Sequence, residues 1–181
     1  MKTKLRKKYQ NLRTTIPSEI RDNYAENIFK IITSNFVLTE KNVSIFLPIT
    51  RFNEVNTWYL INTVSADFYL PVVKNNELKH ILFKDKDQLT LSKWGIEEPS
   101  YGEEITPKKL DFVIVPLLAY DRNGNRIGYG AGFYDNFLIH CNPNCIFIGV
   151  SFFDPETDTI NTYSTDIALH YCVTPNNILK F

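Results

Sequence analysis

The chain has 181 residues, of which 44% are hydrophobic and 14% aromatic, and its 20 basic and 20 acidic residues leave a formal net charge of zero. This composition argues against disorder, no apolar run approaches the roughly 20 residues that cross a bilayer, and the neutral charge provides no general attraction to nucleic acid or a membrane. We therefore expect a single globular domain over residues 1–181, and a cytoplasmic one because no signal peptide is visible. The three cysteines lack a CxxC pair and are expected to be reduced thiols.

A basic helix is predicted at the start of the chain. Residues 2–14 contain six lysines and arginines and no acid. The apolar residues of this stretch recur at helical spacing: Leu5, Tyr9 and Leu12. At about 100° per residue, Lys2, Arg6 and Arg13 project within about 40° of one another beside this apolar stripe. Two interpretations stay open, a solvated amphipathic helix or a set of cations brought to an anionic ligand.

The remaining pattern alternates between helical and extended segments. Ser18 is predicted to cap a second helix after Pro17, and residues 54–64 are also typical of a helix. Short apolar runs predict about five strands, at residues 43–47, 66–73, 112–116, 145–152 and 171–175. Residues 74–107 are charged and irregular, and their sequence predicts little. The alternation favours an α/β fold with three layers, α/β/α, around a mainly parallel sheet.

Two residues outside any motif are candidates for ligand contacts. Glu54 lies near the carboxyl end of the first predicted strand, the edge at which open α/β sheets usually bind ligands. The alternative is that Glu54 stabilises a helix N-terminus through the helix dipole. Trp94 is either ordinary core packing or the wall of a pocket for a flat ring.

The segment DFVIVPLLAYDRNGNRIGYGAGFYD, residues 111–135, combines a buried strand, a glycine-rich loop and a helix start. Four of the seven glycines fall within nine residues, and a helix is predicted from near Phe133. Glycine-rich backbone at a helix start lets N–H groups converge on a phosphate, although a purely structural turn has similar composition. The loop lacks the GK[ST] of a P-loop, and its GxGxG spacing differs from the dinucleotide-binding GxGxxG.

Charged residues flank this loop and strengthen the phosphate interpretation. Arg126 precedes it, and arginine pairs with phosphate through two donors. Asp135 follows it, and a carboxylate beside a phosphate is a natural magnesium ligand. A second acid would come from Asp154, Asp158 or Asp166, and composition does not choose among them.

The run VPLLAYDRNGNRIGYGAGFYD resembles the signature of the 5-formyltetrahydrofolate cyclo-ligase family, VPGLAFD-x-x-G-x-RLGYGGGYYD. The resemblance covers nearly the whole chain. Its further matches are K-x-x-x-R at Lys2 and Arg6, a later arginine at Arg13, E-x-x-T at Glu54 and Thr57, aromatic-x-I-x-x-P at Trp94, Ile96 and Pro99, and a late Asp166 before CVTP. The departures from the pattern are Leu117, Ala131, Phe133 and Thr165. They bear on substrate affinity more than on reaction type.

The resemblance implies a ligase of one-carbon metabolism that closes the ring of 5-formyltetrahydrofolate to 5,10-methenyltetrahydrofolate, with ATP as co-substrate and Mg²⁺ as cofactor. The implied chemistry is phosphorylation of the formyl oxygen followed by attack of N10. The expected partner is this small folate, possibly polyglutamylated, rather than nucleic acid or a membrane, and we expect a monomer. Phosphoryl transfer needs cations, a metal and a backbone cradle rather than a protein nucleophile, which agrees with the residues above.

The same resemblance implies roles for individual residues. ATP would be bound by Lys2, Arg6, Arg126, Gly128, Tyr129, Gly130, Ala131, Gly132, Phe133 and Tyr134. Mg²⁺ would be held by Asp135 and Asp166, the folate by Glu54, Trp94 and Tyr129, and the catalytic residues would be Arg126, Tyr134 and Asp135.

Two other functions are weighed against the enzyme. A non-catalytic nucleotide- or folate-binding protein of the same fold would be indicated by loss of Asp135, Asp166 or Arg126, and all three are present. A nucleic-acid-binding module could use the basic first helix, but a neutral chain with one basic stripe disfavours it.

Overall fold

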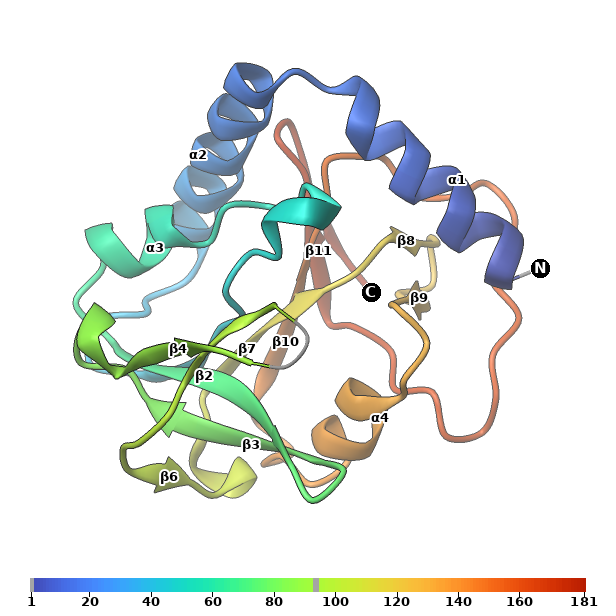
Figure 1. Ribbon diagram of the computed structural model, residues 1–181. Coiled ribbons are helices and arrows are strands. Elements are labelled where there is room, and N and C mark those ends of the chain that lie inside the picture. The colour runs from blue at the N-terminus through green and yellow to red at the C-terminus, as the bar shows by residue number, and fades with distance from the viewer. Residues whose placement is uncertain (1, 93–94) are drawn as a thin grey trace.

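The computed structural model describes residues 2–92 and 95–181 (Figure 1). Within them the helices are α1 (Lys2–Thr15), α2 (Ser18–Asn35), α3 (Trp58–Thr63) and α4 (Phe133–Leu138), with 3₁₀ turns η1 (Thr50–Phe52), η2 (Lys86–Gln88) and η3 (Pro107–Lys109). The strands are β1 (Asn42–Ser44), β2 (Asp67–Lys74), β3 (Glu77–Leu82), β4 (Leu89–Leu91), β5 (Glu97–Pro99), β6 (Glu104–Ile105), β7 (Phe112–Pro116), β8 (Ala119–Tyr120), β9 (Arg126–Ile127), β10 (Ile146–Val150), β11 (Tyr171–Val173) and β12 (Ile178–Lys180).

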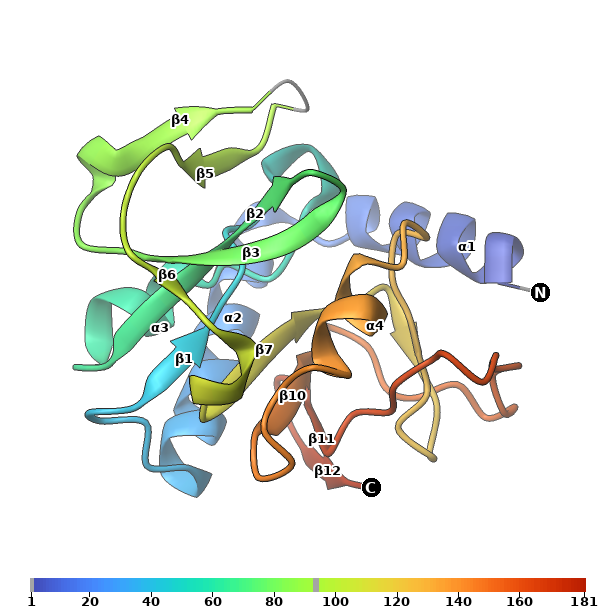
Figure 2. The same ribbon diagram turned by 90° about the horizontal axis from the view of Figure 1, so that it is seen from below.

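A mostly parallel sheet forms the centre of the molecule. Across the described ranges it has eight strands in the order β12-β11-β10-β7-β1-β2-β3-β6. Strands β2, β1, β7, β10 and β11 pair in parallel, whereas β12 pairs antiparallel with β11 and β3 antiparallel with β2 (Figure 2). The parallel strands coincide with the apolar runs found in the sequence, so this part of the prediction is confirmed.

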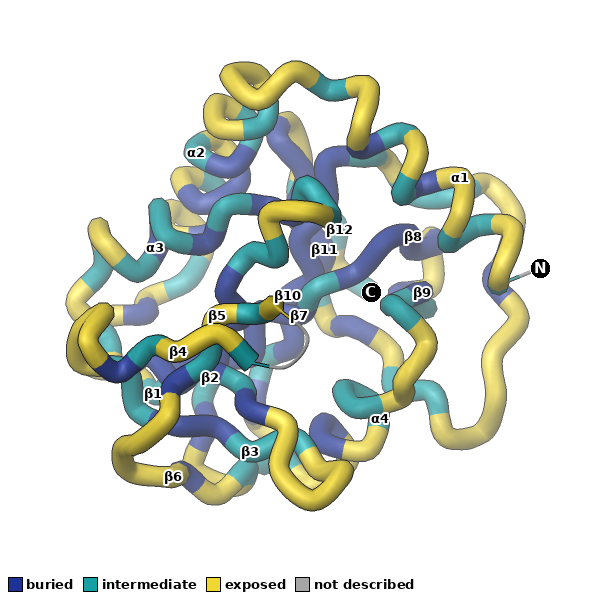
Figure 3. The backbone as a smooth tube through the Cα atoms, viewed as in Figure 1, coloured by how far each residue is buried: buried dark blue, intermediate teal, exposed yellow. Residues whose placement is uncertain are grey.

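Helices cover both faces of the sheet, which gives the predicted three layers. Along β7, Phe112 and Ile114 belong to the core shared with α2 and α3, whereas Val113 and Val115 belong to the core shared with α4. Successive side chains of a strand point to opposite faces, so a strand buried on both sides is apolar at every position. Figure 3 shows these central strands as buried and the outer faces of α1 and α2 as exposed.

Helix α1 packs beside the sheet rather than on it. Its apolar stripe meets a small core around the end of β7 and β9: Leu5, Tyr9 and Leu12 pack with Leu118, Ala119, Ile127 and Ile160. This contact confirms the docked apolar face and holds the basic edge of α1 over the glycine-rich loop. The predicted capping by Ser18 is wrong, because Ser18 is the first residue of α2 and Pro17 stands at the N-cap without a side-chain cap.

The segment 74–107, from which the sequence predicted no elements, contains β3, β4, β5 and β6. Strand β3 follows β2 through a tight turn at Asn75 and Asn76, both with positive φ. Asparagine tolerates that conformation better than most residues, so the Asn-Asn pair was a usable hairpin indication. The alternation of charged and apolar residues in β3 obscured it. No helix in the described part of the chain is long and apolar enough to cross a membrane.

Candidate active site

A cavity of about 650 Å³ opens at the carboxyl ends of the parallel strands. Leu47 follows β1, Pro116 ends β7, and Leu70 and Pro71 lie within β2, and all four line it. Ligands of open α/β sheets bind at this edge, and the volume suits a ligand of nucleotide or folate size. The position agrees with the placement expected for Glu54.

The cavity collects almost every residue that the sequence identified. Its lining includes Lys2, Arg6, Glu54, Arg126, Gly128, Tyr129, Gly130, Ala131, Gly132, Phe133, Tyr134, Asp135 and Asp166. Trp94 lies outside the described residues, so its predicted contact with the folate stays a prediction. Segments more than 100 positions apart in the chain therefore meet in one cavity.

The basic edge of α1 is the first contributor. The Nε of Arg6 donates a hydrogen bond of 2.9 Å to the carbonyl oxygen of Gly128, and the Nζ of Lys2 lies 2.5 Å from Oδ2 of Asp166. These contacts favour the second interpretation of the basic helix, in which its cations are brought to a site elsewhere in the fold. Both cations are thus held beside the loop by partners that a stronger anion could share.

The glycine-rich loop needs glycine at two positions. Gly130 has φ +107° and Gly132 has φ +73°, a region that residues with a side chain rarely adopt. A Cβ at Gly130 would also lie 3.2 Å from Cζ of Arg6. Ala131 is outside the positive-φ set, so the methyl group that distinguishes it from the family pattern causes no backbone strain. Helix α4 begins at Phe133, as predicted.

Arg126 and Asp135 form an ion pair across the base of the loop. The Nη2 of Arg126 lies 2.8 Å from Oδ1 of Asp135, and the Arg126 side chain is only 5% exposed. Its Nη1 donates to the carbonyl oxygen of Ile167, while the N–H of Ile167 donates to the same Oδ1 of Asp135 at 3.0 Å. The segment around Ile167 is thereby tied to both ends of the loop, which brings Asp166 into the cavity.

The two predicted magnesium ligands differ in their surroundings. Partial burial disfavours the charged form of Asp166, but the Lys2 ammonium and the Tyr163 N–H prevail and lower the pKa of this carboxyl. Each carboxylate keeps one oxygen that accepts no hydrogen bond from the described residues. It is Oδ2 in Asp135 and Oδ1 in Asp166. Among the described residues no group of three or more His, Cys, Asp or Glu side chains could hold a metal. Mg²⁺ is commonly held by one or two carboxylates together with phosphate oxygens and waters, so this donor set fits a magnesium ion that arrives with phosphates.

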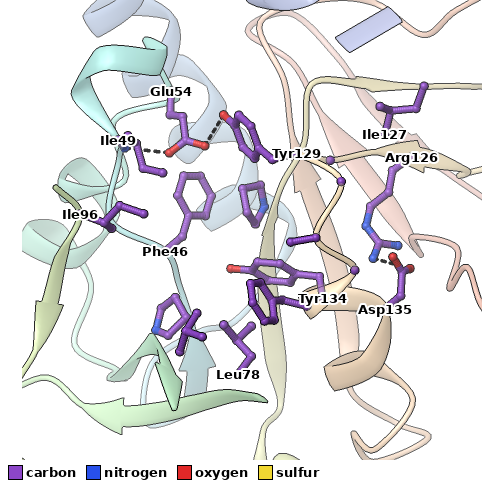
Figure 4. Close-up of a pocket in the computed structure, with 18 of the residues that line it drawn as sticks. Phe46, Ile49, Glu54, Leu78, Ile96, Arg126, Ile127, Tyr129, Tyr134 and Asp135 are labelled. Atoms are coloured by element: carbon purple, nitrogen blue, oxygen red, sulfur yellow. Dashed lines mark hydrogen bonds and ion pairs between the residues drawn. The ribbon is translucent and has the colours of Figure 1, made fainter. Parts of the chain in front are cut away.

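Glu54 lies at another end of the cavity and is almost fully buried, with 7% of its surface exposed. The hydroxyl of Tyr129 donates to its Oε1 at 2.5 Å, and the N–H of Ile49 donates to its Oε2 at 2.7 Å (Figure 4). Burial raises the pKa of Glu54, and these two donors and the nearby Arg13 act against that rise. The Tyr129 ring stacks on Phe52 with 5.2 Å between centroids, which fixes its orientation.

In the view of Figure 4, Tyr134 is drawn between Glu54 and the Arg126–Asp135 ion pair. Its hydroxyl is buried and has no hydrogen-bond partner among the residues that the structure describes. Burial also raises the pKa of Tyr134, so the hydroxyl is a neutral donor at physiological pH. An unpaired buried hydroxyl costs about 1–3 kcal/mol and calls for an explanation. A hydroxyl on the wall of a ligand-sized cavity is explained if a ligand supplies the partner.

The sequence missed several residues of this region. Arg13 was placed on the basic edge but given no role, yet it is buried and donates to the Tyr129 hydroxyl at 2.8 Å. Ile96, Glu97 and Glu98 line the cavity from the β4–β5 hairpin, in the segment where no strands were predicted. The family resemblance had matched Ile96 to its pattern, but Glu97 and Glu98 had no such indication, because only tertiary structure brings this hairpin over the cavity.

The departures Leu117 and Thr165 lie in different surroundings. Leu117 is buried, and its backbone carbonyl accepts a hydrogen bond from Arg13. Its side chain fills the space above Gly149, where an added Cβ would lie 2.6 Å from Leu117 Cδ2. Thr165 lines the cavity beside Asp166.

A glycine-rich loop, cations and two carboxylates lie at one end of the cavity, and a buried glutamate and aromatic rings lie at the other. In an α/β fold, such a cavity at the carboxyl edge of the sheet is typical of an enzyme's active site. The profile of the 5-formyltetrahydrofolate cyclo-ligase family matches residues 1–175. The chain therefore belongs to the 5-formyltetrahydrofolate cyclo-ligase family, as its resemblance implied.

Individual relatives agree with this assignment over most of their length. A 5-formyltetrahydrofolate cyclo-ligase of Mycolicibacterium smegmatis is 28% identical over 184 residues, covering 96% of this chain and 93% of that protein. One from Haemophilus influenzae is 25% identical, covering 93% and 92%. The solution structure of Aquifex aeolicus 5,10-methenyltetrahydrofolate synthetase matches with a TM-score of 0.84 and 29% identity, over 99% of this chain and 92% of that one. A Mycoplasma pneumoniae 5,10-methenyltetrahydrofolate synthetase, at 18% identity and a TM-score of 0.73 over 96% and 98%, shares the fold.

Proposed function

We propose that this protein closes the ring of 5-formyltetrahydrofolate in an ATP- and Mg²⁺-dependent reaction, giving 5,10-methenyltetrahydrofolate, ADP and phosphate. One observation carries the proposal: a single cavity joins a cationic, glycine-rich end to an end with a buried glutamate and aromatic rings. The first suits the phosphates of a nucleotide and the second the pterin ring of a folate. Reacting groups of two substrates would thus be held side by side, which is the main requirement for phosphoryl transfer.

The nucleotide is assigned to the loop and to the basic edge of α1. The backbone from Gly128 to Tyr134 would surround the phosphates, and Lys2 and Arg6 would supply charge from α1. Arg126 is paired with Asp135, so we propose that it shares its guanidinium between this carboxylate and a phosphate oxygen. We also propose a monomer as the active unit, because this chain by itself supplies the groups assigned to both the nucleotide and the folate.

The folate is assigned to the end that contains Glu54. A pterin presents ring N–H and amino donors in one plane, and a carboxylate is the acceptor that matches them. Tyr129 and the apolar wall formed by Phe46, Leu70 and Ile96 would contact the faces of the ring. A contact from Trp94 is part of the proposal as well.

The proposed chemistry has two steps. The formyl oxygen attacks the γ-phosphorus of ATP and ADP leaves; N10 then attacks the formyl carbon, the C–O bond breaks, phosphate leaves and N10 gives up its proton. Tyr134 is proposed to donate its hydroxyl hydrogen to the formyl oxygen as the C–O bond breaks, stabilising the negative charge that develops on the leaving phosphate. Asp135 and Asp166 would hold Mg²⁺, which when bound neutralises charge on phosphate oxygens.

The test is direct. Purified protein is mixed with 5-formyltetrahydrofolate, ATP and Mg²⁺, and methenyltetrahydrofolate is followed by its near-ultraviolet absorbance. We expect product only when all components are present, with ADP formed in equal amount. Calorimetric binding of the folate and the nucleotide without product, while a known cyclo-ligase is active in the same buffer, would instead identify a non-catalytic binding protein.

A further inference from the structure

Arg13, in the last turn of α1, is a buried cation without a direct anionic partner. It is 3% exposed and does not line the cavity, and within the described residues it forms no ion pair with a carboxylate. A buried guanidinium is costly unless its donors are satisfied and its charge is balanced. Its hydrogen-bond partners indicate what offsets this cost.

The donors of Arg13 hold three segments around the folate end of the cavity. Nη1 donates to the Tyr129 hydroxyl at 2.8 Å and to the carbonyl oxygen of Phe52 at 3.4 Å, and Nη2 donates to the carbonyl oxygen of Leu117 at 2.5 Å. The planar fork of arginine can reach three such acceptors at once, which a lysine ammonium at the end of a flexible stem does less well.

The Tyr129 hydroxyl connects this cation to Glu54. It accepts from Arg13 and donates to Oε1 of Glu54 at 2.5 Å, so its hydrogen is directed toward the carboxylate. An ionised acceptor strengthens such a bond, and a cation behind the hydroxyl polarises it in the same direction. The chain Arg13, Tyr129, Glu54 is therefore a buried cation and a buried carboxylate coupled through one hydroxyl.

We propose that Arg13 is a positioning residue for the folate site: through Tyr129 it keeps the Glu54 carboxylate ionised and aimed into the cavity. This inference rests on the proposed function, because it assigns Glu54 to the folate. Arg13 itself touches neither substrate. It would act on folate binding and leave the nucleotide end unaffected.

Other charged groups near Glu54 do not replace Arg13 in this role. The Tyr134 hydroxyl interacts with Glu54, but it is neutral and supplies no positive charge. Arg51 of η1 and Glu97 and Glu98 of β5 line the same cavity but form no hydrogen bond to Glu54. Removing the Arg13 charge should therefore raise the pKa of Glu54, since burial already disfavours its ionised form.

The experiment compares Arg13→Met, Arg13→Lys and a matched control, Arg21→Met. Arg21 also donates to a backbone carbonyl, that of Ile16, and lies outside the cavity lining. KM for each substrate is measured, together with the pH profile of kcat/KM for the folate. For Arg13→Met we expect KM for the folate to rise about tenfold or more, KM for ATP to change less than about twofold, and the acidic limb of the profile to move to higher pH. Arg13→Lys, which keeps the charge, should move the limb back toward wild type.

Two results would overturn the inference. One is an unchanged acidic limb in Arg13→Met; the other is an equal rise of KM for both substrates, which a general loss of structure would produce. If Arg13→Met fails to fold, Arg13→Gln, which keeps hydrogen-bond donors but removes the charge, takes its place and must shift the limb in the same direction. A wild-type protein without activity would refute the proposed function itself, whereas an active wild type with unaffected variants would refute only the role of Arg13.

Discussion

Arg126 and Asp135 close the glycine-rich loop between them, with Nη2 and Oδ1 2.8 Å apart. The same Asp135 oxygen also accepts the N–H of Ile167. A loop whose ends are joined in this way is held in shape before any ligand arrives, and such preorganisation reduces the cost of binding a phosphate.

Asp135→Asn is expected to lower kcat by at least about 100-fold, because the variant loses a charge at the site assigned to magnesium and phosphate. It should also lower the free energy of unfolding by about 1–3 kcal/mol, since the buried Arg126 guanidinium loses its charged partner. Turnover and thermal unfolding are measured beside Asp158→Asn, which removes an exposed carboxylate. Wild-type turnover in Asp135→Asn would remove this residue from the mechanism.

Gly130→Ala tests whether the loop conformation matters. Alanine at φ +107°, with its Cβ 3.2 Å from the Arg6 guanidinium carbon, should cost about 1–2 kcal/mol of stability and raise KM for ATP. Gly128→Ala is the matched control, because a Cβ there meets no atom within 4 Å. Equal melting temperatures for the two variants would contradict the argument from backbone strain.

We expect removal of the Tyr134 hydroxyl to have opposite effects on stability and activity. In Tyr134→Phe the unpaired buried hydroxyl is gone, so the ligand-free protein should gain up to about 1 kcal/mol while kcat falls about tenfold or more. Tyr171→Phe, at a partly buried position on β11, is the control. A variant that loses both stability and activity would indicate that Tyr134 has a structural role.

The sequence anticipated the fold and the site to different depths. The parallel strands could be predicted because strands buried on both faces are apolar at every position, as Phe112–Pro116 is. The glycine-rich end of the cavity could be predicted because glycine spacing and flanking charges are local, and that it binds phosphate stays a prediction. The strands of the β4–β5 hairpin could not, since each has only three residues and gains its place from packing over the cavity. Nor could the connection from Arg13 to Glu54, which joins three segments far apart in the chain.

We expect His80 to make the stability of the protein depend on pH. Its ring is buried and stacks on Phe137, neither ring nitrogen has a partner among the described residues, and burial lowers the pKa of His80 from 6.5 to about 3. Between these values the unfolded chain binds a proton that the folded protein does not, so this residue makes stability fall by about 1.4 kcal/mol for each pH unit below 6.5. Above pH 6.5 His80 is neutral in both the folded and the unfolded chain, and this loss of stability is absent.

Urea unfolding at pH 7, 6 and 5 checks this prediction with His80→Leu. The variant should lose less stability than wild type as the pH falls, while the exposed control His140→Gln should follow wild type. Identical pH dependence in His80→Leu and wild type would show that His80 is not buried in its neutral form.

The central claim is that the γ-phosphoryl group of ATP is transferred to the formyl oxygen within this cavity. It is tested with 5-formyltetrahydrofolate that carries ¹⁸O in its formyl group, by mass spectrometry of the phosphate released with the methenyl product. We expect one ¹⁸O atom in each phosphate, because the formyl oxygen leaves bonded to phosphorus. Phosphate without ¹⁸O, formed together with product, would contradict it.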